Sequence, residues 1–515
     1  MTPVNLTDSI GGRPEQMRSE PDQSAGATRR PRVAMLVAND ITRDSRVQKV
    51  AYSAAQAGFE VLLLGYLPDS SSAPRGESRL GAARVVRTVL TNRYRARVHE
   101  LRATGAGSGS PRIAVLRGAS YSSTINYRFR RRVMKSVQEP GATTGRRVRG
   151  LKGWGKELLW KVYVGDGGWR RTQIHLAQIE AGWWPLVEDF APDVIHAHDM
   201  HTPGIAVRIA DRLGRGGRRP KVIYDAHEFV AGVRMGTVRE RAYQSLEREY
   251  INRADAVVTV SPQLAQLLVD RYGLPATPTV VTNAPFLHTP GAEAEQAPSL
   301  RATIGLAEDV PLIVYSGAIA PMRGVDTMVR ALPDLPGVHA AIVCGRRDDY
   351  VNGLVAQAEA LGAGDRFHVV GYVTPQEVTR FLASATVGVI PLLHTPNHEI
   401  ALITKYYEYL HAGLPIVVSD VEAMAVKTRE LGNGEVFTAG DADSFAAAVR
   451  AVLADRAGYT ASYGPQLLEE NSWEGQAEIL NQLYADLAGT MPEPLSGTHP
   501  FRETAGGGGE STVTR

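Results

Sequence analysis

Residues 31–66 read PRVAMLVANDITRDSRVQKVAYSAAQAGFEVLLLGY, and this stretch decides the fold class. Its opening run, PRVAMLVAND, is apolar in the way typical of a buried strand. The run SRVQKVAYSAAQAG then carries apolar residues at helical spacing up to Gly58, and FEVLLLGY is a second strand-like run. A strand, a helix and a strand in this order form a βαβ unit, which predicts a parallel sheet.

The same alternation continues along the chain and then starts again. Strand-like runs such as PDVIHAHD, KVIYDAHE and DAVVTVS alternate with helical runs. After a stretch rich in Pro, Ala and Glu, the run PLIVYSGA begins a second series of the same kind. The sequence therefore predicts two Rossmann-like, doubly wound α/β domains. Ligands of such sheets bind at the carboxyl ends of the strands, so two domains facing across a cleft would enclose a ligand.

The changes in composition predict where the domains begin and end. The predicted parts are a disordered tail over 1–30, an N-terminal domain over 31–285 with a basic insertion at about 84–171, a linker over 286–309, a C-terminal domain over 310–464, a final helix over 465–489 and a second disordered tail over 490–515.

Composition places the chain among ordinary globular proteins. Of its 515 residues, 43% are hydrophobic and 22% charged. Cys344 is its only cysteine, so no intramolecular disulfide can form, and we expect a buried thiol in a reducing compartment. No apolar run reaches the ~18 residues of a membrane span, and the first 30 residues lack the apolar core of a signal peptide. We therefore expect a cytoplasmic protein whose membrane contact, if any, is peripheral.

The basic insertion is the strongest charge feature. Residues 84–171 hold 21 Lys or Arg against four acids, in runs such as YRFRRRVMK and GWGKELLWKVYVGDGGWRR that also carry Trp and Tyr. Cations beside interfacial aromatics suit an anionic membrane surface, at the inner face of the plasma membrane. A solvated surface insertion is an equally good interpretation. Nucleic acid, which attracts the same charges, is a weaker one.

The loop after the first strand reads NDITRDSRV and has no G-x-G-x-x-G. A dinucleotide-binding loop needs those glycines for backbone to approach a pyrophosphate, so their absence argues against a dehydrogenase. Asp44 and Arg46 either brace the following helix or line the cleft and bind substrate.

Two later strand ends carry histidine and acid. The run HAHDMH contains His198 and Asp199, and its composition invites a zinc site. Alternate strand residues share a face, however, and the order does not match a known metal array, so we expect a polar cleft lining with no metal. The run YDAHE ends its strand with His227 and Glu228, which could hydrogen-bond sugar hydroxyls.

The second series offers a candidate anion site. Arg323 follows the first strand of that series, in YSGAIAPMRG, where a guanidinium could hold a diphosphate. Lys405 and Glu408, in ITKYYEYLHAG, are three residues apart and share one helix face. Lys405 could reach a phosphate, and Glu408 could accept both hydroxyls of a ribose. Taken alone, the pair would more simply be a solvated ion pair.

Together these runs resemble glycosyltransferase family 4, the retaining sugar transferases of GT-B fold. The resemblance covers Pro31–Tyr66 and Pro192–Gly489. It rests on the ordered set DSRVQKVAYSAAQAGFEV, DVIHAHD, VIYDAHE, ADAVVTVS, YSGAIAPMRGVDTMVRAL, FHVVGYVTPQEVTRFLASATVGVIPL, KYYEYLHAGLPIVVSD and SWEGQAEILNQLY. The last of these looks like the closing helix of the family, which crosses back to the N-terminal, acceptor-side domain.

The resemblance implies roles for named residues. Glu408 matches the glutamate that holds the donor ribose, while Arg323 and Lys405 match the residues that hold the diphosphate. His227 matches a histidine near the donor sugar. The remaining implied contacts are Gly317 in the loop after the first strand of the donor domain, and backbone contacts to the base at Tyr372 and Val373.

The implied reaction needs no metal and no cofactor beyond the nucleotide-diphosphate sugar that acts as co-substrate. The acceptor would be a saccharide or a lipid-linked glycan of cell-envelope or exopolysaccharide synthesis. It would attack from the face that the diphosphate leaves, and its proton would pass to that diphosphate.

Two positions depart from the family pattern. Ala318 follows Gly317 where many relatives have Arg, and Ile400 stands where the first glutamate of the E-x7-E motif belongs. Glu399, a further candidate for substrate binding, is adjacent but out of register. Three alternatives stay open. One is a nucleotide-sugar epimerase of the same fold, and another is a non-catalytic GT-B-like subunit, which the departures at Ala318 and Ile400 would favour. The third, from the basic insertion alone, is a nucleic-acid-binding protein.

Overall fold

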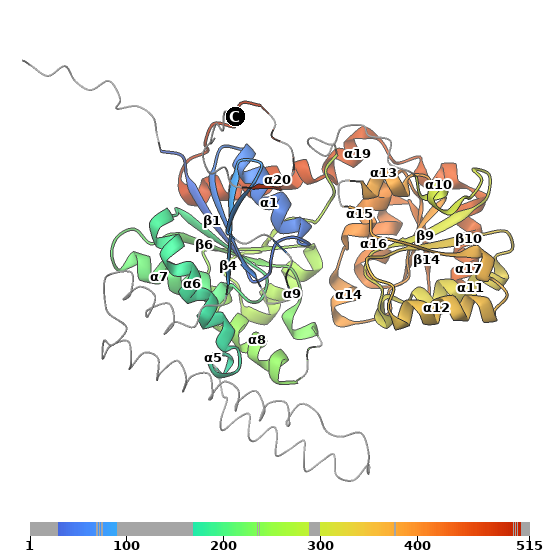
Figure 1. Ribbon diagram of the computed structural model, residues 1–515, viewed down its shortest axis with the longest axis horizontal. Helices are drawn as coiled ribbons and strands as arrows, with labels where there is room; N and C mark the ends of the chain where they lie inside the picture. The colour runs from blue at the N-terminus through green and yellow to red at the C-terminus, as the bar shows by residue number, and fades with distance from the viewer. Residues whose placement is uncertain are drawn as a thin grey trace, which may run out of the picture. The chain divides into compact units, whose positions relative to one another are not determined.

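The computed structural model describes residues 29–67, 71, 73, 76–89, 168–233, 235, 237–287, 299–374, 377–497, 499, 501 and 503–505. The main part of the basic insertion, 90–167, therefore lies outside the described residues. Within the described part, strands form two α/β sheets, as predicted from the sequence (Figure 1).

The first sheet has the strand order β15-β3-β4-β2-β1-β5-β6-β7-β8. Its pairs are parallel except those of β3 with β4 and with β15. The strands are β1 (Arg32–Val37), β2 (Glu60–Leu67), β3 (Gly76–Leu80), β4 (Ala83–Val89), β5 (Val194–His198), β6 (Lys221–Ala226), β7 (Ala256–Thr259), β8 (Thr279–Val280) and β15 (Glu503–Ala505).

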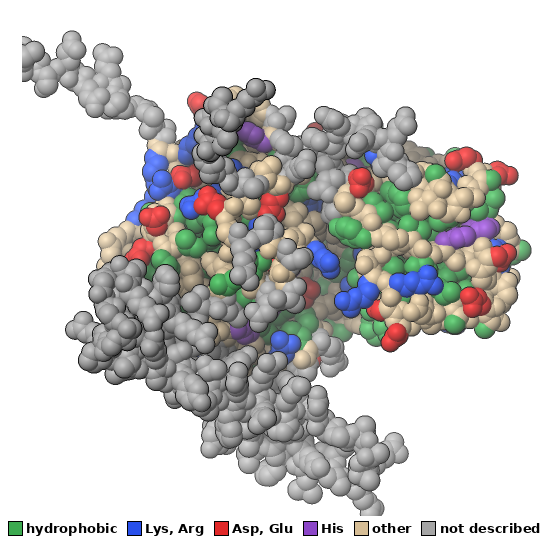
Figure 2. All heavy atoms as spheres, viewed as in Figure 1, with side chains coloured by type: hydrophobic (Ala, Val, Ile, Leu, Met, Phe, Trp, Pro, Cys, Tyr) green, Lys and Arg blue, Asp and Glu red, His purple; other side chains and the backbone are tan. Residues whose placement is uncertain are grey.

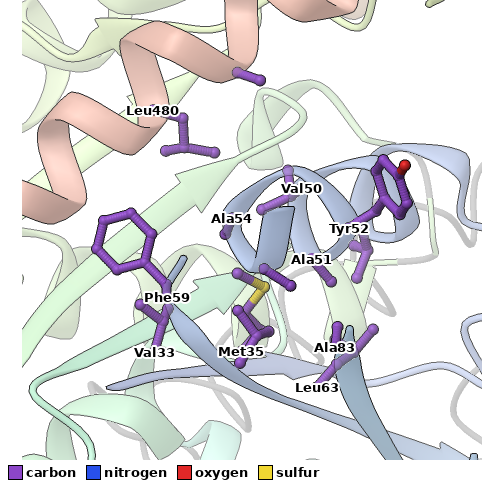
Figure 3. Close-up of a cluster of buried hydrophobic side chains, with 14 of the residues drawn as sticks. Val33, Met35, Val50, Ala51, Tyr52, Ala54, Phe59, Leu63, Ala83 and Leu480 are labelled. Atoms are coloured by element: carbon purple, nitrogen blue, oxygen red, sulfur yellow. The ribbon is translucent and has the colours of Figure 1, made fainter. Parts of the chain in front are cut away.

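Helices cover both faces of this sheet because its central strands are apolar on both sides. In β1, Met35 lies in a core cluster with α1 and α20, whereas Leu36 lies in a second cluster with α6, α7 and α8. Figure 3 shows Leu480 of α20 above Val50 and Phe59. The α-helices are α1 (Ser45–Gln56), α5 (Trp169–Thr172), α6 (Ile174–Phe190), α7 (Pro203–Gly214), α8 (Thr237–Tyr250), α9 (Pro262–Tyr272) and α20 (Trp473–Ala488).

The second sheet is parallel throughout its described strands, in the order β11-β10-β9-β12-β13-β14. The strands are β9 (Leu312–Ser316), β10 (His339–Val343), β11 (Phe367–Val370), β12 (Val387–Ile390), β13 (Ile416–Ser419) and β14 (Gly434–Phe437). Its helices are α10 (Leu300–Ile304), α11 (Val325–Ala331), α12 (Asp349–Ala360), α13 (Val378–Leu382), α14 (Pro396–Ile400), α15 (Thr404–His411), α16 (Glu422–Leu431), α17 (Ala442–Ala454), α18 (Arg456–Thr460) and α19 (Pro465–Glu470).

Residues of β9 again divide between two core clusters. Tyr315 lies with α11, α12 and α17, and Val314 lies with α13, α15 and α16. Cys344, at the end of β10, is buried in the first of these clusters, as the sequence predicted.

The C-terminal segment differs from the predicted disordered tail. Strand β15 pairs antiparallel with β3, and Phe501 is buried against Tyr52 and Phe286. Glu503 accepts hydrogen bonds from the Arg87 guanidinium at 2.5 and 2.7 Å. The sequence around these residues is too short and polar to predict a strand, and the long-range pairing decides its structure.

The structure also places the boundaries of two other segments, the basic insertion and the linker, differently from the prediction. Arg84 and Arg87, assigned to the basic insertion, belong to strand β4, and Arg170 belongs to helix α5. Within the predicted linker, helix α10 buries Leu300 in a core cluster of the second sheet.

The described surface carries no single dominant patch on the face shown in Figure 2, where acidic, basic and hydrophobic side chains are interspersed. Tyr372 is the most exposed of the large hydrophobic side chains in the described part, at 64%. Among the described helices, none combines the length and the apolarity that crossing a membrane requires.

Candidate active site

A pocket of about 690 Å³ is lined by loops that follow strands of both sheets. The first sheet contributes residues 39–46 after β1 and 227–233 after β6. The second contributes Arg323 after β9 and residues 395–404 after β12. The site thus lies at the carboxyl ends of the strands, where open α/β sheets bind their ligands.

Two cations of the second sheet lie at the site or next to it: Arg323 lines the pocket, and Lys405 follows the pocket residue Thr404 without lining the pocket itself. The Lys405 ammonium lies over Gly317, where a Cβ would be 2.3 Å from Nζ. Gly317 has a φ of +123°, which favours glycine, and its missing side chain leaves the space that Lys405 fills. Burial lowers the pKa of Lys405 and the positive charge of Arg323 lowers it further, although Glu408 acts in the opposite direction. Two cations that repel each other in a half-buried place would be stabilised by an anion between them.

Glu408 lies one turn after Lys405 on α15. Burial raises the pKa of its carboxyl, and the charges of Lys405 and Lys49 oppose that rise. The tyrosines of the same helix have other roles: Tyr406 and Tyr409 are buried, and the Tyr409 hydroxyl donates to the Val314 carbonyl at 3.1 Å. The tyrosine face of the helix is buried, and Lys405 and Glu408 lie on its half-buried side.

Asp225 organises the end of the first sheet. Arg46 donates to its two carboxylate oxygens at 2.9 and 3.0 Å, and both residues are buried. His227 Nε2 lies 3.1 Å from Oδ2, and His198 Nδ1 lies 3.4 Å from the same oxygen. Burial lowers the pKa of His227, but the charge of Asp225 and its hydrogen bond to the ring act together in the opposite direction, so the pKa is raised overall. Asp225 therefore favours a charged His227 ring at the pocket wall.

The cluster also has to be considered as a metal site. His196, His198 and Asp225 bring possible ligand atoms within 4.8 Å of one another. The Arg46 guanidinium already occupies both oxygens of Asp225, and its charge would repel a cation. His196 Nδ1 lies 2.5 Å from the Tyr484 hydroxyl of α20. We interpret the cluster as a buried polar network, and we assign no metal to it.

The structure brings some predicted residues to the pocket. Asp44, Arg46, His227, Glu228 and Arg323 all line it. Asp44 also braces the following helix, which was the alternative role predicted for it from the sequence. Its carboxylate caps α1 by accepting a hydrogen bond from Val47 N at 3.2 Å.

Other predicted residues lie elsewhere. His198 is fully buried beneath His227 and cannot touch a ligand in this conformation. Asp199 has a φ of +67° and accepts from Met200 N, which fixes the turn after β5. Five further predicted residues are not among those that line the pocket: Gly317, Tyr372, Val373, Lys405 and Glu408.

Glu399 is turned away from the pocket. Its carboxylate lies 2.6 Å from His394 Nδ1 and accepts from Glu422 N at 3.0 Å, so it braces the start of α16. Ile400 lines the pocket in its place.

Sequence reasoning missed several polar pocket residues. Asn39, Arg43, Asn283, Asn397 and His398 line the site. The run TPNHEI between β12 and α15 was the available signal, since Thr, Pro and Asn after a buried strand indicate a loop at the ligand edge of the sheet.

Comparison with known proteins identifies the family. Residues 160–284 match the family described as Glycosyltransferase Family 4, and residues 296–465 match Glycosyl transferases group 1. The chain belongs to glycosyltransferase family 4. It is a retaining transferase of the GT-B fold that takes its sugar from a nucleotide-sugar donor, and the sequence-based predictions of family and fold are confirmed.

The relatives are distant. The chain is 25% identical over 304 residues to an uncharacterized glycosyltransferase, MJ1607, of Methanocaldococcus jannaschii. The aligned region covers 57% of this chain and 75% of that protein. It is 24% identical over 336 residues to the D-inositol 3-phosphate glycosyltransferase of Mycobacterium marinum, and this alignment covers 61% of this chain and 69% of that protein.

Solved structures share the fold of this glycosyltransferase. A sucrose-phosphate synthase from Thermosynechococcus elongatus matches with a TM-score of 0.60 at 19% identity, over 89% of this chain and 99% of that one. HepE of Anabaena in complex with UDP matches with a TM-score of 0.54 at 14% identity, over 88% of this chain and 100% of that one.

Proposed function

We propose that Arg323 and Lys405 bind the diphosphate of the donor and that Glu408 binds its ribose. The observation that carries the proposal is that Arg323 lines the pocket and its charge acts on Lys405, which follows the pocket residue Thr404. Gly317 leaves room for Lys405, and Glu408 lies one turn further along α15. A diphosphate would relieve the repulsion between the cations, and a carboxylate can accept two hydroxyl hydrogens. HepE, which shares the fold, binds UDP.

The reaction follows from this placement. The bond between the anomeric carbon and the diphosphate oxygen breaks, and charge develops on that oxygen and on the sugar ring. Arg323 and Lys405 stabilise the leaving oxygen. The acceptor oxygen then bonds to the anomeric carbon on the same face, and its proton passes to the diphosphate. His227, held by Asp225 at 3.1 Å, lies on the other wall of the pocket and contacts the donor sugar.

The acceptor enters from the first sheet. Asn39, Asp40 and Arg43 line the pocket on that side and can hydrogen-bond hydroxyl or phosphate groups. We propose a saccharide or lipid-linked acceptor of cell-envelope or exopolysaccharide synthesis. The mycobacterial relative is named for a phosphorylated acceptor, which suits a cation such as Arg43.

Replacing Glu408 tests the donor site. Glu408→Ala should raise the Kd of the free nucleoside and of its diphosphate by about tenfold or more, because both carry the ribose, and should lower transfer at least as much. Calorimetry and a transfer assay measure the two effects, with Glu408→Gln as the matched variant of similar size. Unchanged nucleoside affinity in Glu408→Ala would contradict the ribose assignment.

We further propose that the basic insertion docks the enzyme on an anionic membrane that carries the acceptor. Deleting residues 92–165 leaves strand β4 and helix α5 in place. The deletion should abolish sedimentation with vesicles containing phosphatidylglycerol while transfer to a water-soluble acceptor persists. Equal vesicle binding with and without the insertion would contradict this proposal, and loss of RNA binding alone would favour the nucleic-acid alternative.

A further inference from the structure

One wall of the pocket is apolar. Phe229, Val260 and Leu264 line it from the first sheet, and Ile400 and Leu402 line it from the second. Ile400 packs against the hydrophobic cluster that contains Leu264. The Ser261 hydroxyl donates to the Ile400 carbonyl at 2.5 Å, which fixes the backbone of this residue.

The acid that precedes Ile400 in the sequence is already bound elsewhere. Glu399 accepts from the backbone of Glu422 at 3.0 Å and lies 2.6 Å from His394 Nδ1. His394 Nε2 in turn lies 3.1 Å from Asp420, so the acid belongs to a small network outside the pocket. Turning Glu399 into the pocket would break these contacts, so it does not supply a hydrogen-bond acceptor at the apolar wall.

The wall lies where the donor sugar must sit. Thr404, the neighbour of Lys405, lines the pocket together with Arg323, and Ile400 is on the same segment. A sugar joined to a diphosphate between Arg323 and Lys405 therefore extends along Ile400 and Leu402. A hydroxyl that faces these side chains would lose its hydrogen bonds to water without gaining others.

We propose that Ile400 determines donor specificity, and that the enzyme selects a sugar with a deoxy carbon or a methyl group facing this residue. The inference rests on the proposed donor site and names the sugar class that fits it. A C–H or CH₃ group gains contact with Ile400, Val260 and Leu264, whereas a hydroxyl at the same carbon is rejected. Polar residues that line the pocket, such as His227 and Glu228, serve the remaining hydroxyls.

The test compares matched donors. Glucose and its 3-, 4- and 6-deoxy analogues are linked to UDP and to GDP, and the Kd and the kcat/KM of each are measured on the full chain. The wild type should prefer at least one deoxy analogue over glucose by about tenfold or more. Ile400→Glu should abolish or reverse that preference because the carboxylate can accept from the hydroxyl, and Ile400→Leu should keep it. Ile400→Thr, smaller and polar, serves if the glutamate variant does not fold.

The outcomes separate this inference from the proposed donor site. If UDP or GDP binds but glucose is preferred to all three analogues, or if Ile400→Glu weakens all donors equally, Ile400 does not determine specificity and the donor site stands. If none of UDP, GDP, ADP and dTDP binds the wild type, both proposals fail. A preference for one deoxy sugar that Ile400→Glu removes supports the inference.

Discussion

Single residues decide what the pocket can bind. A glutamate and a lysine from one short helix and an arginine from one loop would be ordinary surface charges in isolation. Gly317 makes the difference, because a side chain there would occupy the place of the Lys405 ammonium. Ile400 has the opposite effect, since it removes a polar partner from the wall where the sugar is expected.

Substituting Gly317 tests the space that it leaves. In Gly317→Ala the new Cβ would lie 2.2 Å from Lys405 Cε, so the lysine must move. We expect the Kd for a nucleoside diphosphate to rise by about tenfold or more, on top of a stability loss of about 1 kcal/mol from the positive φ. Gly432→Ala is the matched control, because Gly432 also has a positive φ of 60° but nothing within 4 Å. Calorimetry should find the same nucleotide affinity in the control; equal effects in both variants would contradict the role of Gly317.

At the scale of elements, helix packing buries groups that titrate. Lys49 of α1 donates to the Ala284 carbonyl, and its ammonium lies 4.7 Å from the ring centre of Trp473 of α20. Burial, helped by the charge of Arg46, lowers the pKa of Lys49 to about 7, although Glu408 and Glu474 oppose this. The contact joins the first helix of the chain to its last long helix, next to the proposed ribose ligand.

The Lys49 pKa predicts a pH dependence of stability. Between pH 7 and about pH 10 the unfolded chain keeps this proton while the folded chain loses it, so stability rises with pH by up to about 1.4 kcal/mol per unit. Lys49→Met should remove that rise. Urea unfolding of both proteins at pH 7, 8.5 and 10 measures the difference, with Lys427→Met on α16 as the control. Parallel curves for wild type and Lys49→Met would show that Lys49 keeps its charge.

The elements also show what a sequence can predict. The βαβ runs were predictable because apolar periodicity is local. The strand ends gave His227 and Arg323 as candidates, and a shared helix face gave Lys405 and Glu408. Strand β15 was not predictable, since its stability comes from pairing with β3 and from the Arg87–Glu503 ion pair. The burial of His198 and of the Arg46–Asp225 pair depends in the same way on residues that are distant along the chain.

For the molecule as a whole, the proposed function assigns different halves of one reaction to the two sheets. In that proposal, Arg323, Lys405 and Glu408 of the second sheet hold the donor, and His227 and the polar loop after β1 of the first sheet serve the sugar and its acceptor. Nearly every nucleotide sugar shares the diphosphate, so the cations are the least specific part of the site and the one on which all donors depend. In this account, the apolar wall that contains Ile400 determines which sugar the enzyme accepts.

The affinity for the diphosphate tests this account most directly. Calorimetry compares a nucleoside with its diphosphate, using whichever of UDP, GDP, ADP and dTDP most raises the melting temperature of the wild type. In Arg323→Met and in Lys405→Met, the advantage of the diphosphate over the nucleoside should shrink by about tenfold or more, while the nucleoside keeps its Kd. An advantage that is unchanged in both variants would contradict the account, because the diphosphate would then bind somewhere other than between Arg323 and Lys405.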